Sequence, residues 1–157
     1  MRRKQTGVKS FTAKSDSIKR ILKTGVYISP AYDAKGNSIT DFLDKTEWDA
    51  IWDTGATSSL ITQRVASHFG LISFAQSNIN TPSGQFISNI YFVNMLLPNQ
   101  ITINKLRVLE GIGSNFDVLI GMDIITRGDF AVTNFASKTI FSFRMPSRTM
   151  IDFTVEG

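Results

Sequence analysis

The chain has 157 residues, an apolar fraction of 42% and a mean hydropathy near zero, as expected for one globular domain large enough to bury a core. It contains no cysteine and one histidine, which excludes a disulfide framework, a cysteine nucleophile and a multi-histidine metal centre. We therefore expect no metal and no cofactor. No apolar run approaches the roughly 18 residues of a membrane span, and no secretory signal follows the basic start, so we expect no membrane contact and a cytoplasmic protein.

The net charge of +4 is concentrated at the N-terminus. Residues 1–23 hold eight basic residues and one acidic residue, a net charge of +7, which leaves −3 for residues 24–157. We expect 1–23 to be a basic, flexible arm and 24–157 to be the folded domain. Such an arm could contact nucleic acid or an acidic partner. Because polar termini are more often only mobile and solubilising, a nucleic-acid partner is not expected.

Short extended segments dominate the rest of the chain. The segments expected to be strands are short apolar or β-branched runs bounded by turn residues, and they are 26–28, 47–52, 60–61, 86–97, 101–108, 116–120, 130–133, 139–144 and 150–155. Within 101–108 the apolar alternation changes phase, which predicts a turn or bulge at Asn104-Lys105. Short helices are expected after Thr62, ending at Gly70, and at 122–126. This pattern predicts an all-β, closed or barrel-like domain with one or two short helices.

A carboxylate lies at the end of the apolar strand 47–52, in the triplet Asp53-Thr54-Gly55. An acid followed by a hydroxyl residue and a glycine is suited to a tight turn where backbone segments come close. Asp53 is therefore expected to be held rigidly, and its candidate catalytic role is implied by the resemblance of its context to a known family, since the triplet alone is a weak signal. The single histidine, His68, has no suggestive neighbours and is interpreted as a surface residue.

The context of the triplet resembles the retropepsin-like aspartic peptidases. An apolar strand, the triplet, Ala56-Thr57, a turn at 81–84 and the segment Leu119-Ile120-Gly121 follow one another as they do in that family. The resemblance covers about 26–143, and Asp123, two residues after Gly121, makes it closest in kind to microbial and cellular members. It implies the closed β-barrel of the acid protease fold.

The resemblance implies an aspartic endopeptidase that hydrolyses peptide bonds in a peptide or protein substrate. One Asp53 per chain implies that a second chain supplies the other carboxylate, in a two-fold symmetric homodimer. The resemblance also implies that Thr54 forms a hydrogen bond across the dimer interface and that Gly55 lets the substrate backbone approach.

The resemblance further implies a flap, the hairpin turn at 83–86, that closes over the substrate. The residues that it assigns to substrate binding are Ala56, Thr57, Leu60, Ser83, Gly84, Gln85, Phe86 and Leu119. Leu60 and Leu119 could equally be core residues. Thr57 and Met122 stand where many viral members carry an acidic residue and its arginine partner, so the substrate contacts of that acid are not carried over.

An alternative reading is a non-catalytic module of the same fold that dimerises or binds peptides. The intact triplet favours the enzyme, because a scaffold has no need of an aspartate at the dimer axis. The segment after Arg144 carries no motif, and in the family the chain ends commonly build part of the dimer interface.

Overall fold

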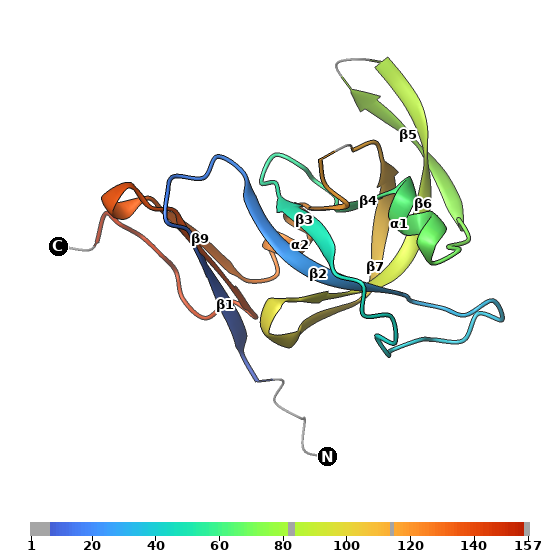
Figure 1. Ribbon diagram of the computed structural model, residues 1–157, viewed down its shortest axis with the longest axis horizontal. Coiled ribbons are helices and arrows are strands. Elements are labelled where there is room, and N and C mark those ends of the chain that lie inside the picture. Colours follow the sequence, from blue (N-terminus) through green and yellow to red (C-terminus); the bar gives the residue numbers. More distant parts are fainter. Residues whose placement is uncertain (1–6, 82–83, 114, 156–157) are drawn as a thin grey trace.

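The computed structural model describes residues 7–81, 84–113 and 115–155, which are mostly β with two short α-helices (Figure 1). The strands are β1 (Lys9–Lys14), β2 (Leu22–Pro30), β3 (Trp48–Trp52), β4 (Leu60–Thr62), β5 (Ala75–Thr81), β6 (Gly84–Leu97), β7 (Ile101–Gly111), β8 (Val118–Ile120), β9 (Asp129–Thr133) and β10 (Ile140–Met145). The helices are α1 (Gln63–His68) and α2 (Met122–Ile125), with single 3₁₀ turns at η1 (Pro98–Gln100) and η2 (Phe135–Ser137). The predicted class and both predicted helices are confirmed.

Strand β2 closes the larger sheet on itself. The strand order is β2-β3-β8-β4-β7-β6-β5, and β2 also pairs with β6. Residues 22–26 of β2 pair antiparallel with β3, whereas residues 27–30 pair antiparallel with β6. The ring therefore consists of β2, β3, β8, β4, β7 and β6 in that spatial order. Strand β5 lies outside it as one arm of a projecting hairpin (Figure 1). This pairing confirms the closed arrangement that the sequence predicts.

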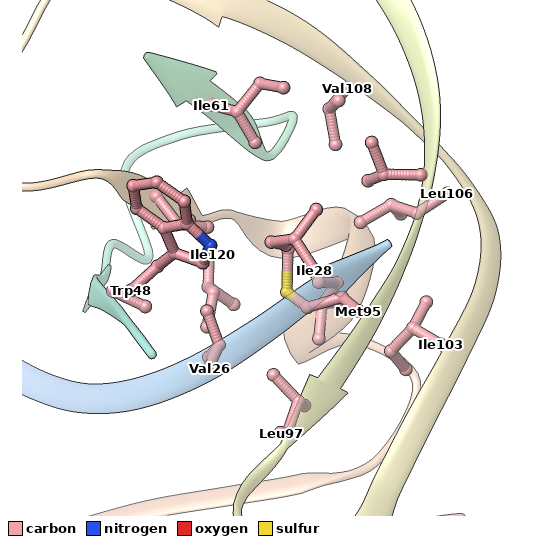
Figure 2. Packing of buried hydrophobic residues seen from close by; sticks show 14 of the residues in the cluster. Val26, Ile28, Trp48, Ile61, Met95, Leu97, Ile103, Leu106, Val108 and Ile120 are labelled. Atoms are coloured by element: carbon pink, nitrogen blue, oxygen red, sulfur yellow. The ribbon is translucent and has the colours of Figure 1, made fainter. Parts of the chain in front are cut away.

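Aliphatic side chains fill the interior of the ring. Successive residues of a strand point to opposite faces, so each strand gives alternate residues to this core. Figure 2 shows side chains from distant strands, such as Ile28, Met95 and Ile120, pointing toward one another, and all three are fully buried. Burying each large aliphatic side chain contributes about 1.5–3 kcal/mol, so the ring is the main source of stability.

A bulge interrupts the pairing of β6 with β7. Val93 lies opposite Leu106, and the next pair joins Met95 to Ile103, so two residues of β7 oppose Asn94 alone. Lys105, one of the two, has a φ of 53°, and its N–H donates to the buried Asn94 Oδ1 at 3.0 Å. The bulge predicted from the change of phase is confirmed.

A second, three-stranded sheet in the order β1-β10-β9 packs against the end of β3 through aromatic rings. The Trp52 ring lies 5.7 Å from Phe11, 5.8 Å from Phe141 and 5.1 Å from Phe143, measured between centroids. The Trp52 Nε1–H also donates to Thr24 Oγ1 at 3.0 Å. Trp52, the residue immediately before Asp53, is therefore held in place by the second sheet and by Thr24.

Two segments differ from the sequence expectation. Lys9–Lys14, inside the basic arm, form β1 and pair antiparallel with β10 because Phe11 and Ala13 alternate toward the aromatic cluster. The strand expected at 150–155 is wrong, since Asp152 Oδ1 accepts hydrogen bonds from the Thr154 N–H and hydroxyl at 2.9 and 2.6 Å and folds a turn there. Within the described residues, no helix is long and apolar enough to cross a membrane.

Candidate active site

Asp53 directly follows β3 and is held by backbone contacts on two sides. Its N–H donates to the Ile120 carbonyl at 2.9 Å, and its Oδ1 accepts the Gly55 N–H at 2.8 Å. The Ala56 N–H donates to the Asp53 carbonyl at 3.3 Å. A Cβ at position 55 would lie 3.2 Å from Asp53 Oδ1, a tight contact, so glycine suits this turn. The side chain of Asp53 is half-buried with its carboxylate oriented by this bond.

The loop at 53–59 lies across the end of β8. Strand β8 runs parallel to β3 and antiparallel to β4, so it separates the two strands that the loop connects. A Cβ on Gly121, the next residue, would lie 2.8–2.9 Å from backbone atoms of Ser58 and Ala56, a distance that real Cβ atoms do not adopt. The Met122 N–H donates to the Ala56 carbonyl at 2.8 Å. Glycine at position 121 therefore lets the two segments touch.

A pair of hydrogen bonds between the buried Ser59 and the half-buried Asp123 holds the far end of the same loop. The Ser59 hydroxyl, fully buried, donates to Asp123 Oδ1 at 2.6 Å, and the Ser59 N–H donates to Asp123 Oδ2 at 2.9 Å. The Ser59 oxygen in turn accepts the Gly121 N–H at 3.0 Å. Sequence reasoning noted Asp123 only within the resemblance and gave Ser59 no role, because the two residues lie 64 positions apart.

The two leucines predicted to line the substrate site are neighbours on adjacent strands. Leu60 on β4 pairs with Leu119 on β8. Leu119 is only 8% exposed, whereas Leu60 is half-buried. The burial of Leu119 is what a core residue requires, and contact of either residue with a substrate stays a prediction.

The described residues of the predicted flap lie at the start of β6. Gly84 and Gln85 are exposed and Phe86 is half-buried, and they pair with 79–81 of β5. Gly84 has a φ of +128°, which favours glycine. Ser83 lies outside the described residues. The outer ends of β5 and β6, the loop at 53–59 and residues 112–113 and 115–117 all lie toward the top of the view in Figure 1.

The remaining predicted residues of the loop face outward. Thr54 and Thr57 are exposed and Ala56 is half-buried. Within the described part of the chain, no hydrogen bond involves the Thr54 side chain. The main chain of Thr57 is nevertheless anchored, because its carbonyl accepts the Asp123 N–H at 3.2 Å.

His68 lies away from the Asp53 loop, on the outer side of α1. Its Nε2 is 2.7 Å from Asp44 Oδ2, and its ring is edge-on to Trp48. This hydrogen bond, with a further bond from Thr46, lowers the pKa of Asp44 to about 2. His68 is exposed, as the sequence predicts, and ties the β2–β3 connection to α1.

Comparison with known proteins agrees with this geometry. The model of the family described as "gag-polyprotein putative aspartyl protease" matches residues 42–127, more than half of the chain, and this range includes the triplet and Gly121. The solved structure of a retropepsin-like aspartic protease from Rickettsia conorii is similar with a TM-score of 0.52 and 11% identity, over 88% of this chain and 95% of that chain. A protease from simian foamy virus (mac) gives a TM-score of 0.43 and 17% identity, over 65% and 89% of the two chains.

No curated protein sequence matches the chain. The Rickettsia likeness, at low identity, shows the fold alone, and it confirms the retropepsin-like architecture predicted from the sequence. The match of the family model covers enough of the chain to show membership. The chain therefore belongs to this aspartyl protease family.

Proposed function

We propose that the protein is an aspartic endopeptidase, active as a homodimer in which each chain supplies one Asp53. The observation that carries this proposal is the Asp53 turn. Its carboxylate is half-buried, accepts the Gly55 N–H at 2.8 Å, and follows a strand whose main chain is bonded to β8. A carboxylate oriented in this way at the edge of a rigid ring is suited to act on a substrate bound above it.

The chemistry requires two carboxylates close together. Because two like charges at short range cannot both ionise, the pair shares one proton. The ionised Asp53 takes a proton from water as the water oxygen attacks the peptide carbonyl carbon, and the protonated Asp53 donates a hydrogen bond to the carbonyl oxygen. The tetrahedral intermediate then collapses as a proton passes to the amide nitrogen and the C–N bond breaks.

The second carboxylate comes from a second copy, since the chain carries the triplet once. Two-fold symmetry brings identical loops together on the axis. The exposed Thr54 hydroxyl, which has no described partner, is available for the bond across the interface that the resemblance implies. Dilution should therefore abolish activity before it unfolds the monomer.

The substrate is an extended peptide or protein segment held between the loop and the flap. Gly55, Ala56 and Thr57 lie at the loop, and the described flap residues 84–86 lie on the projecting hairpin. Closure of the hairpin would exclude water from the reacting bond.

The test is Asp53→Asn, which keeps the size of the side chain but removes the general base. Digestion of a peptide library, read by mass spectrometry, should fall by several orders of magnitude while the fold and the dimer persist. Asp41→Asn, at an exposed loop position, is the matched control and should cleave like wild type. The wild type should give a bell-shaped pH profile that belongs to the pair of carboxylates.

If Asp53→Asn cleaves the library as well as wild type does, the proposal fails. A dimerisation or peptide-binding module with the same fold would then take its place.

A further inference from the structure

A groove lined by apolar and basic side chains lies beside β3, the strand that precedes Asp53. It consists of two adjoining cavities of about 430 and about 330 Å³, and both are lined by Ile21 and Lys23. The first extends along the β1–β2 connection, and the second reaches Ile51 and the loop at 112–116. Residues 15–21, 112–113 and 115–117 lie on the same side of the ring as the Asp53 loop (Figure 1).

Exposed aliphatic side chains gather along this groove. Ile18 is 49% exposed and Ile21 is 60% exposed in the first cavity, and Ile112 is 89% exposed in the second. A single exposed aliphatic residue needs no explanation, but several along one groove are typical of a surface that binds another chain.

The same groove is positively charged. Lys19, Arg20 and Lys23 line it and are exposed, and none of the described lining residues is acidic. Within the described part of the chain, none of these three cations forms an ion pair. The Lys23 Nζ lies 3.5 Å from the Asn115 carbonyl, a weak contact that leaves its charge uncompensated.

The main chain that carries these cations is held in place by hydrogen bonds. The Lys19 N–H donates to Thr139 Oγ1 at 2.8 Å, and the Thr139 N–H donates to the Ser17 carbonyl at 3.2 Å. Lys23 belongs to β2, where it pairs with Ile51 of β3. These contacts hold the main chain of this part of the arm on the folded protein, and the three cations project from it.

Strand geometry connects the groove to the candidate active site. Successive residues of a strand point to opposite faces, so Ile51, two residues before Asp53, lies on the face opposite Trp52, which packs into the aromatic cluster. Ile51 lines the second cavity together with Lys23. A peptide extending from Asp53 over Ile51 would therefore pass Lys23 first and Arg20 and Lys19 beyond it.

We infer that this groove binds an acidic stretch of the substrate, so the enzyme prefers peptides with aspartate or glutamate a few residues from the cleaved bond. The inference rests on the proposed peptidase function. An aliphatic floor with a cationic rim complements a peptide that mixes apolar and acidic side chains. Proteins that bind single-stranded nucleic acid usually stack its bases on exposed aromatic rings. Of the two aromatic side chains that line this groove, Phe141 is buried and Phe116 is half-buried.

The test measures binding to the inactive Asp53→Asn protein, so cleavage cannot distort it. Four fluorescent peptides share a central apolar pair. Each carries either an acidic Glu-Glu-Asp stretch or a neutral Gln-Gln-Asn stretch, placed either before or after the pair. The acidic peptide should bind about tenfold tighter in one of the two placements. Adding Lys19→Gln, Arg20→Gln and Lys23→Gln should remove this preference, each contributing about twofold. Lys35→Gln, on an exposed loop elsewhere, should leave it unchanged.

Equal affinity for the two peptides would overturn the inference, as would a preference that survives the triple substitution. Binding of a single-stranded oligonucleotide that is tighter than peptide binding, and is lost in the triple variant, would assign the groove to nucleic acid. A shift of the monomer–dimer equilibrium in the triple variant, with the peptide preference intact, would assign it to the second copy. Absence of cleavage by wild type would defeat the proposed function, whereas the binding comparison would still decide the role of the groove.

Discussion

The loop at 53–59 and the β5–β6 hairpin lie at the same edge of the ring but are held in opposite ways. The loop donates hydrogen bonds to the Ile120 carbonyl and the Asp123 carboxylate and accepts one from the Gly121 N–H, so β8 and the start of α2 hold it at both ends. The outer part of the hairpin, 84–89, pairs only with β5, and its Ile87 side chain is largely exposed. In the proposed enzyme Asp53 must stay fixed while the hairpin closes over the substrate. A firmly bonded loop and a weakly held hairpin meet these two requirements.

The hairpin is anchored at its base by a polar cluster around Glu110. The Tyr91 hydroxyl donates to Glu110 Oε2 at 2.5 Å, and the Ser88 hydroxyl donates to the Glu110 carbonyl at 2.8 Å. Burial and the carboxylate of Glu110 raise the pKa of Tyr91 to about 12. Motion of the hairpin is therefore expected beyond Ser88 and not at its base.

The largest effect is expected where the loop touches β8. Gly121→Ala forces a Cβ to within 2.8–2.9 Å of the backbone at 56–58, so the loop must shift. We expect a loss of at least about 3 kcal/mol in the free energy of unfolding, measured with urea. Gly7→Ala is the matched control, because nothing lies within 4 Å of the added Cβ. A loss below about 1 kcal/mol for Gly121→Ala would mean that the loop is not rigid.

A smaller loss is expected from Ser59→Ala. This substitution leaves the Gly121 N–H without its acceptor and removes the 2.6 Å bond to Asp123. A buried group left unpaired costs about 1–3 kcal/mol. Ser67→Ala, on the exposed side of α1, should change the unfolding free energy by less than about 0.5 kcal/mol. If Ser59→Ala and Ser67→Ala were equally stable, the hydrogen bonds of Ser59 with Asp123 and Gly121 would not be what holds the loop in place.

Local patterns account for what the sequence predicts correctly. The Asp53 turn depends on three consecutive residues, and the bulge at Asn104-Lys105 depends on a phase change visible within eight residues. The pairing of Ser59 with Asp123 depends on strands that meet only in the folded ring, so no local pattern reveals it.

The two errors near the chain ends have opposite causes. Strand β1 has only Phe11 and Ala13 as inward residues, and the surrounding basic residues conceal this alternation. The apolar run at 150–155 has the opposite problem, because its composition favours a strand whereas Asp152 forms a local turn. Cavities such as the basic groove join loops distant in sequence, so the sequence shows their charge but not their position.

Hydrogen exchange tests the contrast directly. Amides of 85–87 should exchange roughly a hundredfold faster than those of β8, because the outer hairpin can open without breaking the ring. A peptide-like inhibitor should slow exchange at 85–87 and leave β8 unchanged. Slow exchange at 85–87 in the free protein, unaffected by the inhibitor, would show that the hairpin is as rigid as the loop.

The smallest effect is expected at Asp129, remote from both regions, where acid should loosen the second sheet and spare the Asp53 loop. Its carboxylate accepts hydrogen bonds from the Ser147 hydroxyl, the Arg148 N–H and Arg144, which lower its pKa from 3.8 to about 2. Since the folded pKa is the lower one, this stabilisation is complete above the unfolded value of 3.8 and is lost as the pH falls toward 2. Asp129→Asn should therefore lower the melting temperature at neutral pH and flatten its acid dependence between these values. If the melting temperature of Asp129→Asn differs from that of wild type by the same amount at every pH in this range, Asp129 does not couple folding to pH.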